Sequence, residues 1–170
     1  MAKILALGGD GIGPEILAEG LRVLDLVAGS AGLSFEIDHG VLHGASWDLH
    51  GTFCTGEVLH VARASDAVLV GAVGGAKWDD IRVPGGAECQ DGLMYLRHHL
   101  QTYLGLRPAR CWPALRHRSS IRPEILGHAD VLILREMCGG AMFATERGIE
   151  IDKDRRRGYD MTAYDEGEIA

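Results

Sequence analysis

The chain has 170 residues and a formal net charge of −7, and 46% of its residues are hydrophobic. This length suits one domain or slightly more, and the acidic balance argues against a general nucleic-acid binder, whose affinity comes from neutralising phosphates. No apolar run approaches the roughly 20 residues of a membrane span. The four cysteines, Cys54, Cys89, Cys111 and Cys138, form no CxxC pair, which predicts reduced thiols in a cytoplasmic protein.

Strand-like and helix-like patterns alternate along the first part of the chain. The predicted strands cover residues 3–7, 34–38 and 67–73, and the predicted helices cover residues 14–28 and 56–64. The third strand is apolar throughout, as strands of parallel sheets tend to be. Strands that alternate with helices predict an α/β fold with a mainly parallel sheet flanked by helices.

The later part of the chain has a weaker pattern. A glycine-rich loop over residues 74–92 precedes a helix that is predicted from residue 93 to about residue 104. An apolar strand is predicted over residues 131–134. Charged residues at 152–157 predict an exposed hairpin or arm, and no internal repeat is found.

The stretch GGDGIGPEI, at residues 8–16, raises the question of whether its turn binds the phosphates of a dinucleotide. The Rossmann fingerprint requires G-x-G-x-x-G, with a separate steric reason for each glycine. The stretch fits in neither register, because Pro14 or Asp10 takes the place of a required glycine. Asp10 and Glu15 would also repel a pyrophosphate at the start of the helix. The stretch therefore predicts a strand-to-helix turn at a ligand-binding sheet edge, but not a Rossmann loop.

Three arginines are candidates for a shared anion site. Arg97 follows Leu93 by four residues, so both lie on one face of the predicted helix, and Arg107 follows the end of that helix. Arg135 comes just after the predicted strand, at the edge where α/β proteins bind ligands. Three arginines in one pocket suit a dicarboxylate, because each can hold a carboxylate bidentately. The alternative is that Arg97 and Arg107 are solvated charges at a helix end.

Four stretches carry a family resemblance in their order and spacing: GGDGIGPEI at 8–16, GAVGGAKWD at 71–79, GLMYLRHHLQTYLGLRPAR at 92–110 and VLILREMCGG at 131–140. Together they resemble the isocitrate and isopropylmalate dehydrogenases, and most of all the N-terminal half of the isopropylmalate enzymes. The resemblance implies a non-Rossmann fold and the NAD-dependent oxidative decarboxylation of a 2-hydroxy dicarboxylic acid in leucine biosynthesis. It also implies Mg²⁺ or Mn²⁺ as a cofactor and places the first stretch in a turn beside NAD.

The resemblance also assigns roles to individual residues. It implies that Arg97, Arg107 and Arg135 bind the carboxylates of the substrate and that Leu93 contacts its apolar substituent. The residues that it places along NAD are Gly75, Lys77, Trp78, Asp79 and Gln90. Gln90 stands where the family usually has an acidic residue, or Glu88 does if the loop carries a two-residue insertion. The alternative is that residues 74–90 form a mobile surface loop.

Two departures from the family lead us to expect an altered or absent activity. Met142 occupies the position of the tyrosine that donates a proton to the enol, and methionine has no proton to give. The catalytic lysine and the metal-binding aspartates of the family would lie beyond residue 170. We therefore expect a truncated form with no metal site and no activity by itself. The adjacent His98 and His99 point in different directions on a helix and do not predict a metal site.

The resemblance predicts an incomplete two-domain organisation. Residues 1–107 are expected to form part of the large cofactor-side domain, and residues 108–170 to begin the second domain, which in this family builds the dimer. The expected partners are a small-molecule dicarboxylate and either a second copy of the chain or a homologue, with no nucleic acid and no membrane. The alternative function is that of a non-catalytic homologue that binds an anion or a protein partner.

Overall fold

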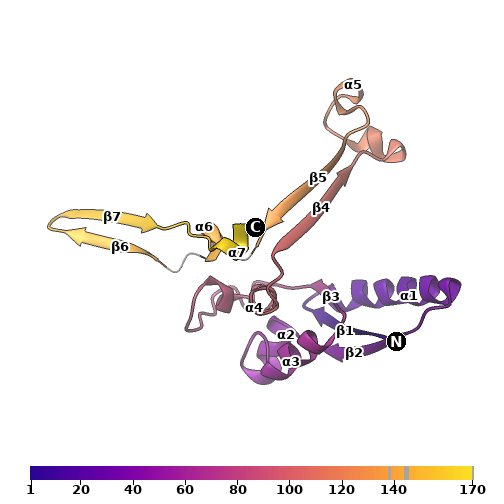
Figure 1. Cartoon of the computed structure of the whole chain (residues 1–170), viewed down its shortest axis with the longest axis horizontal. Coiled ribbons are helices and arrows are strands. Elements are labelled where there is room, and N and C mark those ends of the chain that lie inside the picture. The colour runs from indigo at the N-terminus through magenta and orange to yellow at the C-terminus, as the bar shows by residue number, and fades with distance from the viewer. Residues whose placement is uncertain (138, 144–145, 170) are drawn as a thin grey trace.

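The computed structural model describes residues 1–137, 139–143 and 146–169, without the side chains at positions 87, 141, 142 and 168. Figure 1 shows a compact N-terminal body, from which two β-hairpins extend in different directions. The helix α4 lies between this body and the bases of both hairpins.

A three-stranded parallel sheet forms the centre of the N-terminal body. Its strands are β1 (Ala2–Gly9), β2 (Phe35–Gly40) and β3 (Ala67–Ala72), in the order β2-β1-β3. The central strand β1 is covered on both faces, because Leu5 and Leu7 on one face and Ile4 and Ala6 on the other are all buried. The prediction of a parallel sheet flanked by helices is confirmed.

Three helices pack around this sheet, and two of them match the sequence prediction. They are α1 (Gly13–Ala31), α2 (Gly44–His50) and α3 (Gly56–Ala64). The hydroxyl of Thr55 accepts a hydrogen bond from the backbone N–H of Val58 and so caps α3. The helix α2 was not predicted, because its two turns are too short to show an apolar period.

The hydrophobic core joins the sheet to α3 and to α4 (Gly92–His99). Its buried members include Leu5, Leu7, Leu42, Leu59 and Leu96. Because Leu96 is buried in this core, α4 is anchored to the N-terminal body, and the residues next to Leu96 hold defined positions.

The helix α4 is shorter than predicted. Asp91 caps its start by accepting hydrogen bonds from the backbone N–H groups of Leu93 and Met94, and a short 3₁₀ helix (Ala87–Gln90) precedes it. The prediction that the helix continues to about Leu104 was wrong. The chain takes a left-handed conformation at Gln101, with φ of 52°, and Leu104 then pairs with β5.

The first hairpin consists of β4 (Leu104–Arg110) and β5 (Asp130–Glu136), which run antiparallel. A 3₁₀ helix (Pro113–Arg118) and α5 (Pro123–Leu126) lie at its tip. Strand β5 was predicted, whereas β4 was not, and its first residue, Leu104, had been placed at the end of the predicted helix. The domain boundary expected between residues 107 and 108 lies inside β4, and that boundary stays a prediction.

The second hairpin pairs β6 (Arg147–Asp152) with β7 (Arg155–Asp160) and is exposed along nearly all of its length. The prediction of an exposed hairpin at this charged segment is confirmed. Two single turns, α6 (Gly140–Phe143) and α7 (Glu166–Ile169), lie at its base (Figure 1). No helix in the described part of the chain is long and apolar enough to cross a membrane.

Candidate functional site

The pairing of β4 with β5 places two of the predicted arginines on one face of the first hairpin. Arg107 lies opposite Ile133, and Arg135 lies opposite Gly105. Because residues two apart on a strand share a face, Arg107 and Arg135 are diagonal neighbours across the two strands. Two basic side chains from distant parts of the sequence are thereby brought together.

The third arginine reaches the same region from α4. Arg97 is partly buried, and burial lowers the pKa of its guanidinium. The positive charge of Arg135 lowers this pKa further, Asp91 raises it, and Arg107 makes a smaller lowering contribution. The three arginines are thus close enough for their charges to interact, and an anion bound among them would relieve the repulsion.

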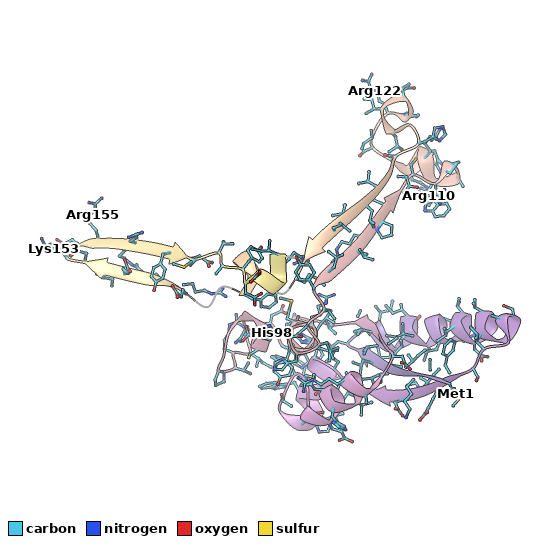
Figure 2. All side chains as sticks on the ribbon, viewed as in Figure 1. Met1, His98, Arg110, Arg122, Lys153 and Arg155 are labelled. Carbon is cyan, nitrogen blue, oxygen red and sulfur yellow. The ribbon has the colours of Figure 1, made fainter. Side chains whose placement is uncertain are left out.

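The apolar residue of the predicted pocket lies one helical turn before Arg97. Leu93 is half-buried and packs against the edge of the hydrophobic core. Figure 2 shows His98 of α4 near the base of the first hairpin, whereas Arg110 and Arg122 lie at its far tip. Arg97, which precedes His98, therefore lies near the base of the hairpin, whereas Arg110 and Arg122 lie at its far tip.

On the expected cofactor side, Lys77 and Trp78 are turned toward α2. The ammonium of Lys77 donates to Asp48 over 2.6 Å, and the indole N–H of Trp78 donates to the other oxygen of that carboxylate over 3.2 Å. The hydrogen bond from Lys77, followed by that from Trp78, lowers the pKa of Asp48. Gly75 and Asp79 are exposed. Sequence reasoning missed Asp48, because nothing near it in the sequence indicates these partners.

Gln90 holds the loop in shape through its side-chain amide. Its amide nitrogen donates to the carbonyls of Val83 (2.8 Å) and Gly86 (3.4 Å), and its amide oxygen accepts from the N–H of Val83 (3.2 Å). The nearby Glu88 accepts from the N–H of Gly86. Both candidates for the acidic position of the family thus make hydrogen bonds within the loop itself.

Gln90→Glu is expected to loosen the loop, because a carboxylate cannot donate to the carbonyl of Val83 and would repel it. Hydrogen exchange of the backbone amides of residues 83–90 should become several-fold faster. Gln101→Glu, on the exposed segment after α4, serves as the control and should leave those amides unchanged. Unchanged exchange in Gln90→Glu would contradict the role of this amide in shaping the loop.

The glycine-rich turn at residues 8–16 is organised around a carboxylate of the chain itself. Asp10 is buried, and its side chain accepts hydrogen bonds from the backbone N–H groups of Gly44, Ala45 and Gly74. A carboxylate of the chain thus lies buried in the turn where a bound phosphate would have to sit, and the two negative charges would repel each other. This geometry agrees with the prediction that the turn is not a Rossmann loop. Sequence reasoning noted the charge of Asp10 but missed its partners.

Two predictions concern Met142 and the absence of a metal site. The side chain of Met142 lies outside the described part of the structure, so its role stays a prediction. Within residues 1–137, 139–143 and 146–169, no three His, Cys, Asp or Glu side chains gather as a metal ion would require. His98 is exposed, and its ring meets that of His99 nearly edge-on at 5.4 Å.

Comparisons with known proteins agree on one family. The family model described as isocitrate/isopropylmalate dehydrogenase matches residues 3–170. The 3-isopropylmalate dehydrogenases of Methylococcus capsulatus and Pseudomonas fluorescens are 43% and 45% identical to the chain over 168 residues. Each alignment covers 98% of this chain and 46% of the relative, so the chain spans about half the length of these relatives.

Solved structures support the same fold. Isocitrate dehydrogenase from M. capsulatus matches with a TM-score of 0.69 and 20% identity, covering 96% of this chain and 43% of that one. A β-decarboxylating dehydrogenase from Thermococcus kodakarensis matches with a TM-score of 0.64 and 24% identity, covering 96% and 41%. Together with the match of the family model to nearly every residue, these findings show that the chain belongs to the isocitrate/isopropylmalate dehydrogenase family.

Proposed function

We propose that the chain provides the substrate-carboxylate pocket and the cofactor-side loop of an NAD-dependent 3-isopropylmalate dehydrogenase. The observation that carries the proposal is that Arg107 and Arg135 share one face of the first hairpin, with their charges acting on the partly buried Arg97. The names of relatives that are 43–45% identical to the chain support this choice of substrate. Leucine biosynthesis in the cytoplasm is the corresponding setting, and it is part of the proposal.

The arginines suit the substrate of this reaction. A malate derivative carries two carboxylates, and a guanidinium binds a carboxylate through two parallel hydrogen bonds. Leu93, one turn from Arg97, offers an apolar surface for the isopropyl group. In this arrangement the chain fixes both ends of the substrate and so orients the C–H bond from which the hydride leaves.

NAD would accept the hydride from the C2 carbon, and the exposed loop that begins at Gly74 is its proposed location. A Cβ built on Gly74 would meet no described atom within 4 Å, so this backbone has open space around it. Gly75 and Asp79, which are also exposed, border that space in the loop. The side chains of Lys77 and Trp78 would act indirectly here, by holding the loop against Asp48.

The described residues contain no group of three His, Cys, Asp or Glu side chains that could hold a metal ion. No step of the reaction is therefore assigned to a metal here. That the 170 residues alone do not turn over the substrate is likewise a proposal. NADH absorbance of the purified chain with isopropylmalate, NAD and Mg²⁺ tests it.

The proposal also includes self-association or pairing with a homologue. Four consecutive apolar residues of β5, at 131–134, are each at least half exposed, as is Leu106 of the neighbouring β4. The face of this ribbon opposite Arg107 and Arg135 carries Leu106, Leu132 and Leu134, and an exposed apolar face of this kind favours contact with another surface. Light scattering measures this directly, and a sharp monomer peak would count against it.

A second candidate function is non-catalytic binding of an anion or a protein partner. Two replacements favour it, namely Met142 at the tyrosine position and Gln90 at the acidic position. Catalysis requires suitable side chains at positions 142 and 90, whereas binding of an anion requires only the three arginines.

The dicarboxylate pocket is tested by titrating the chain with malate, with isothermal calorimetry or chemical shifts as the readout. We expect a dissociation constant on the order of 1 mM that rises with salt. Arg135→Ala should weaken binding about tenfold, a change of about 1.4 kcal/mol. The control Arg122→Ala, at the remote tip, should have no effect. An equal response to malate and acetate, or unchanged binding in Arg135→Ala, would contradict the pocket.

A further inference from the structure

The carboxylate of Asp10 joins two segments that are far apart in the sequence. One oxygen accepts from the N–H of Ala45 over 2.7 Å, and the other accepts from the N–H groups of Gly44 (3.2 Å) and Gly74 (2.9 Å). The first two donors begin α2, and the third begins the cofactor-side loop. A buried carboxylate is stable only when its oxygens are hydrogen-bonded, so the position of Gly74 depends on Asp10.

His43 lies beside Asp10 in a conformation that the surrounding structure must enforce. Its φ is 57°, in the left-handed region that residues other than glycine rarely adopt. The imidazole is buried, stacks on Phe53 with ring centroids 4.8 Å apart, and meets the indole of Trp78 at 6.4 Å. Strain of this kind persists only where several contacts determine the position of a residue.

The two ring nitrogens of His43 face different segments of the chain. Nδ1 accepts a hydrogen bond from the N–H of Gly92 over 3.4 Å, and Nε2 lies 4.0 Å from a carboxylate oxygen of Asp10. The contact between Nε2 and Asp10 is longer than a hydrogen bond, and the peptide bond from His43 to Gly44, whose N–H binds Asp10, joins the two residues as well. Gly92 begins α4, which carries Leu93 and Arg97.

Gly92 and Gly44 show how closely these segments are packed. A Cβ on Gly92 would lie 2.5 Å from the carbonyl oxygen of Phe53 and 2.8 Å from the nitrogen of His43. A Cβ on Gly44 would lie 2.4 Å from the indole of Trp78. The start of α4 and the cofactor-side loop therefore rest on the same two residues of the chain, His43 and Gly44.

We infer that Asp10 and His43 form a buried link that positions the cofactor-side loop and the substrate-binding helix α4 relative to each other. Gly74 is held at one end of this link and Gly92 at the other. The inference rests on the proposed function for the meaning of these two segments. Asp10 and His43 are positioning residues, since they act on substrate and cofactor through the backbone that they hold.

A link between Asp10 and His43 predicts an effect that two independent local roles would not produce. If Asp10 served only Gly74 and His43 served only Gly92, each substitution would affect its own partner alone. If the pair is a link, Asp10→Asn should also disturb Gly92, and His43→Phe should also disturb Gly74. Phenylalanine keeps the ring that stacks on Phe53 but removes both nitrogens.

The test is hydrogen exchange of the backbone amides of Gly74 and Gly92 in the full 170-residue chain, referenced to the amide of Leu59 in α3. We expect both amides to exchange at least tenfold faster in His43→Phe and in Asp10→Asn. His43→Gln, which retains an oxygen acceptor, should restore much of the protection. His50→Phe, at the exposed end of α2, is the control and should change neither amide.

Malate titration of the same variants tests whether the link between Asp10 and His43 affects the proposed substrate pocket. His43→Phe should weaken malate binding at least threefold through the displacement of α4, and His50→Phe should not. A change at Gly92 without a change at Gly74 in His43→Phe, or the reverse in Asp10→Asn, would overturn the link. Exchange is measured without ligand, so failure of the unaltered chain to bind malate would count against the proposed function alone. Should His43→Phe not fold, Asp10→Asn still tests the link, through the exchange of the Gly92 amide.

Discussion

Met142→Tyr is expected to raise the turnover of a fusion enzyme by tenfold or more. The fusion joins this chain to the C-terminal part of the P. fluorescens relative, which is 45% identical over the shared segment. The family resemblance implies that a tyrosine at this position protonates the enol left by decarboxylation. General acid catalysis typically contributes about 10²- to 10⁴-fold to a rate, and methionine cannot supply it.

The effect should appear in kcat with little change in KM, because proton donation acts in the transition state and not in substrate binding. Met161→Tyr, at an exposed methionine after β7, is the matched control and should leave the rate unchanged. NADH formation and loss of CO₂ measure the two chemical steps separately. Equal rates with Met and Tyr at position 142 would make non-catalytic binding the preferred function.

Gly13→Ala is expected to destabilise the chain by about 3 kcal/mol, at the upper end of the cost of overpacking. A Cβ at this position would lie 2.2 Å from the carbonyl oxygen of Gly8 and 2.6 Å from that of Ala72. Both are backbone atoms of adjacent strands, so neither can move without distorting the sheet. The substitution would therefore push the start of α1 away from the ends of β1 and β3.

Gly20→Ala is the control for this prediction, because it lies in the same helix and a Cβ there would meet no described atom within 4 Å. Alanine in a helix interior is more favourable than glycine by about 0.5–1 kcal/mol, so Gly20→Ala should stabilise the chain. Urea denaturation compares the two variants through their midpoints. Equal midpoints would show that α1 is not packed against β1 and β3 as described.

For the arginine site, the sequence identified the candidate residues, and the tertiary structure decided their arrangement. The sequence indicated Arg97, Arg107 and Arg135 through their residue type and their places after a helix or a strand. Whether they meet was decided by the register of β4 and β5, in which Gly105 lies opposite Arg135. That register is set by pairing between segments about 30 residues apart, which no local pattern records.

Local periodicity determined the parallel sheet, α1 and α3, because burial of one apolar face dictates the spacing of residues along each element. The end of α4 was decided by tertiary structure, since the pairing of Leu104 with Glu136 draws the chain out of the helix. The same holds for Asp10, whose acceptors pair with donors 34, 35 and 64 residues away. The sequence by itself determined that a carboxylate replaces a phosphate-binding glycine in this turn. Only the folded chain decided which N–H groups that carboxylate holds, because those groups converge when the three strands of the sheet are aligned.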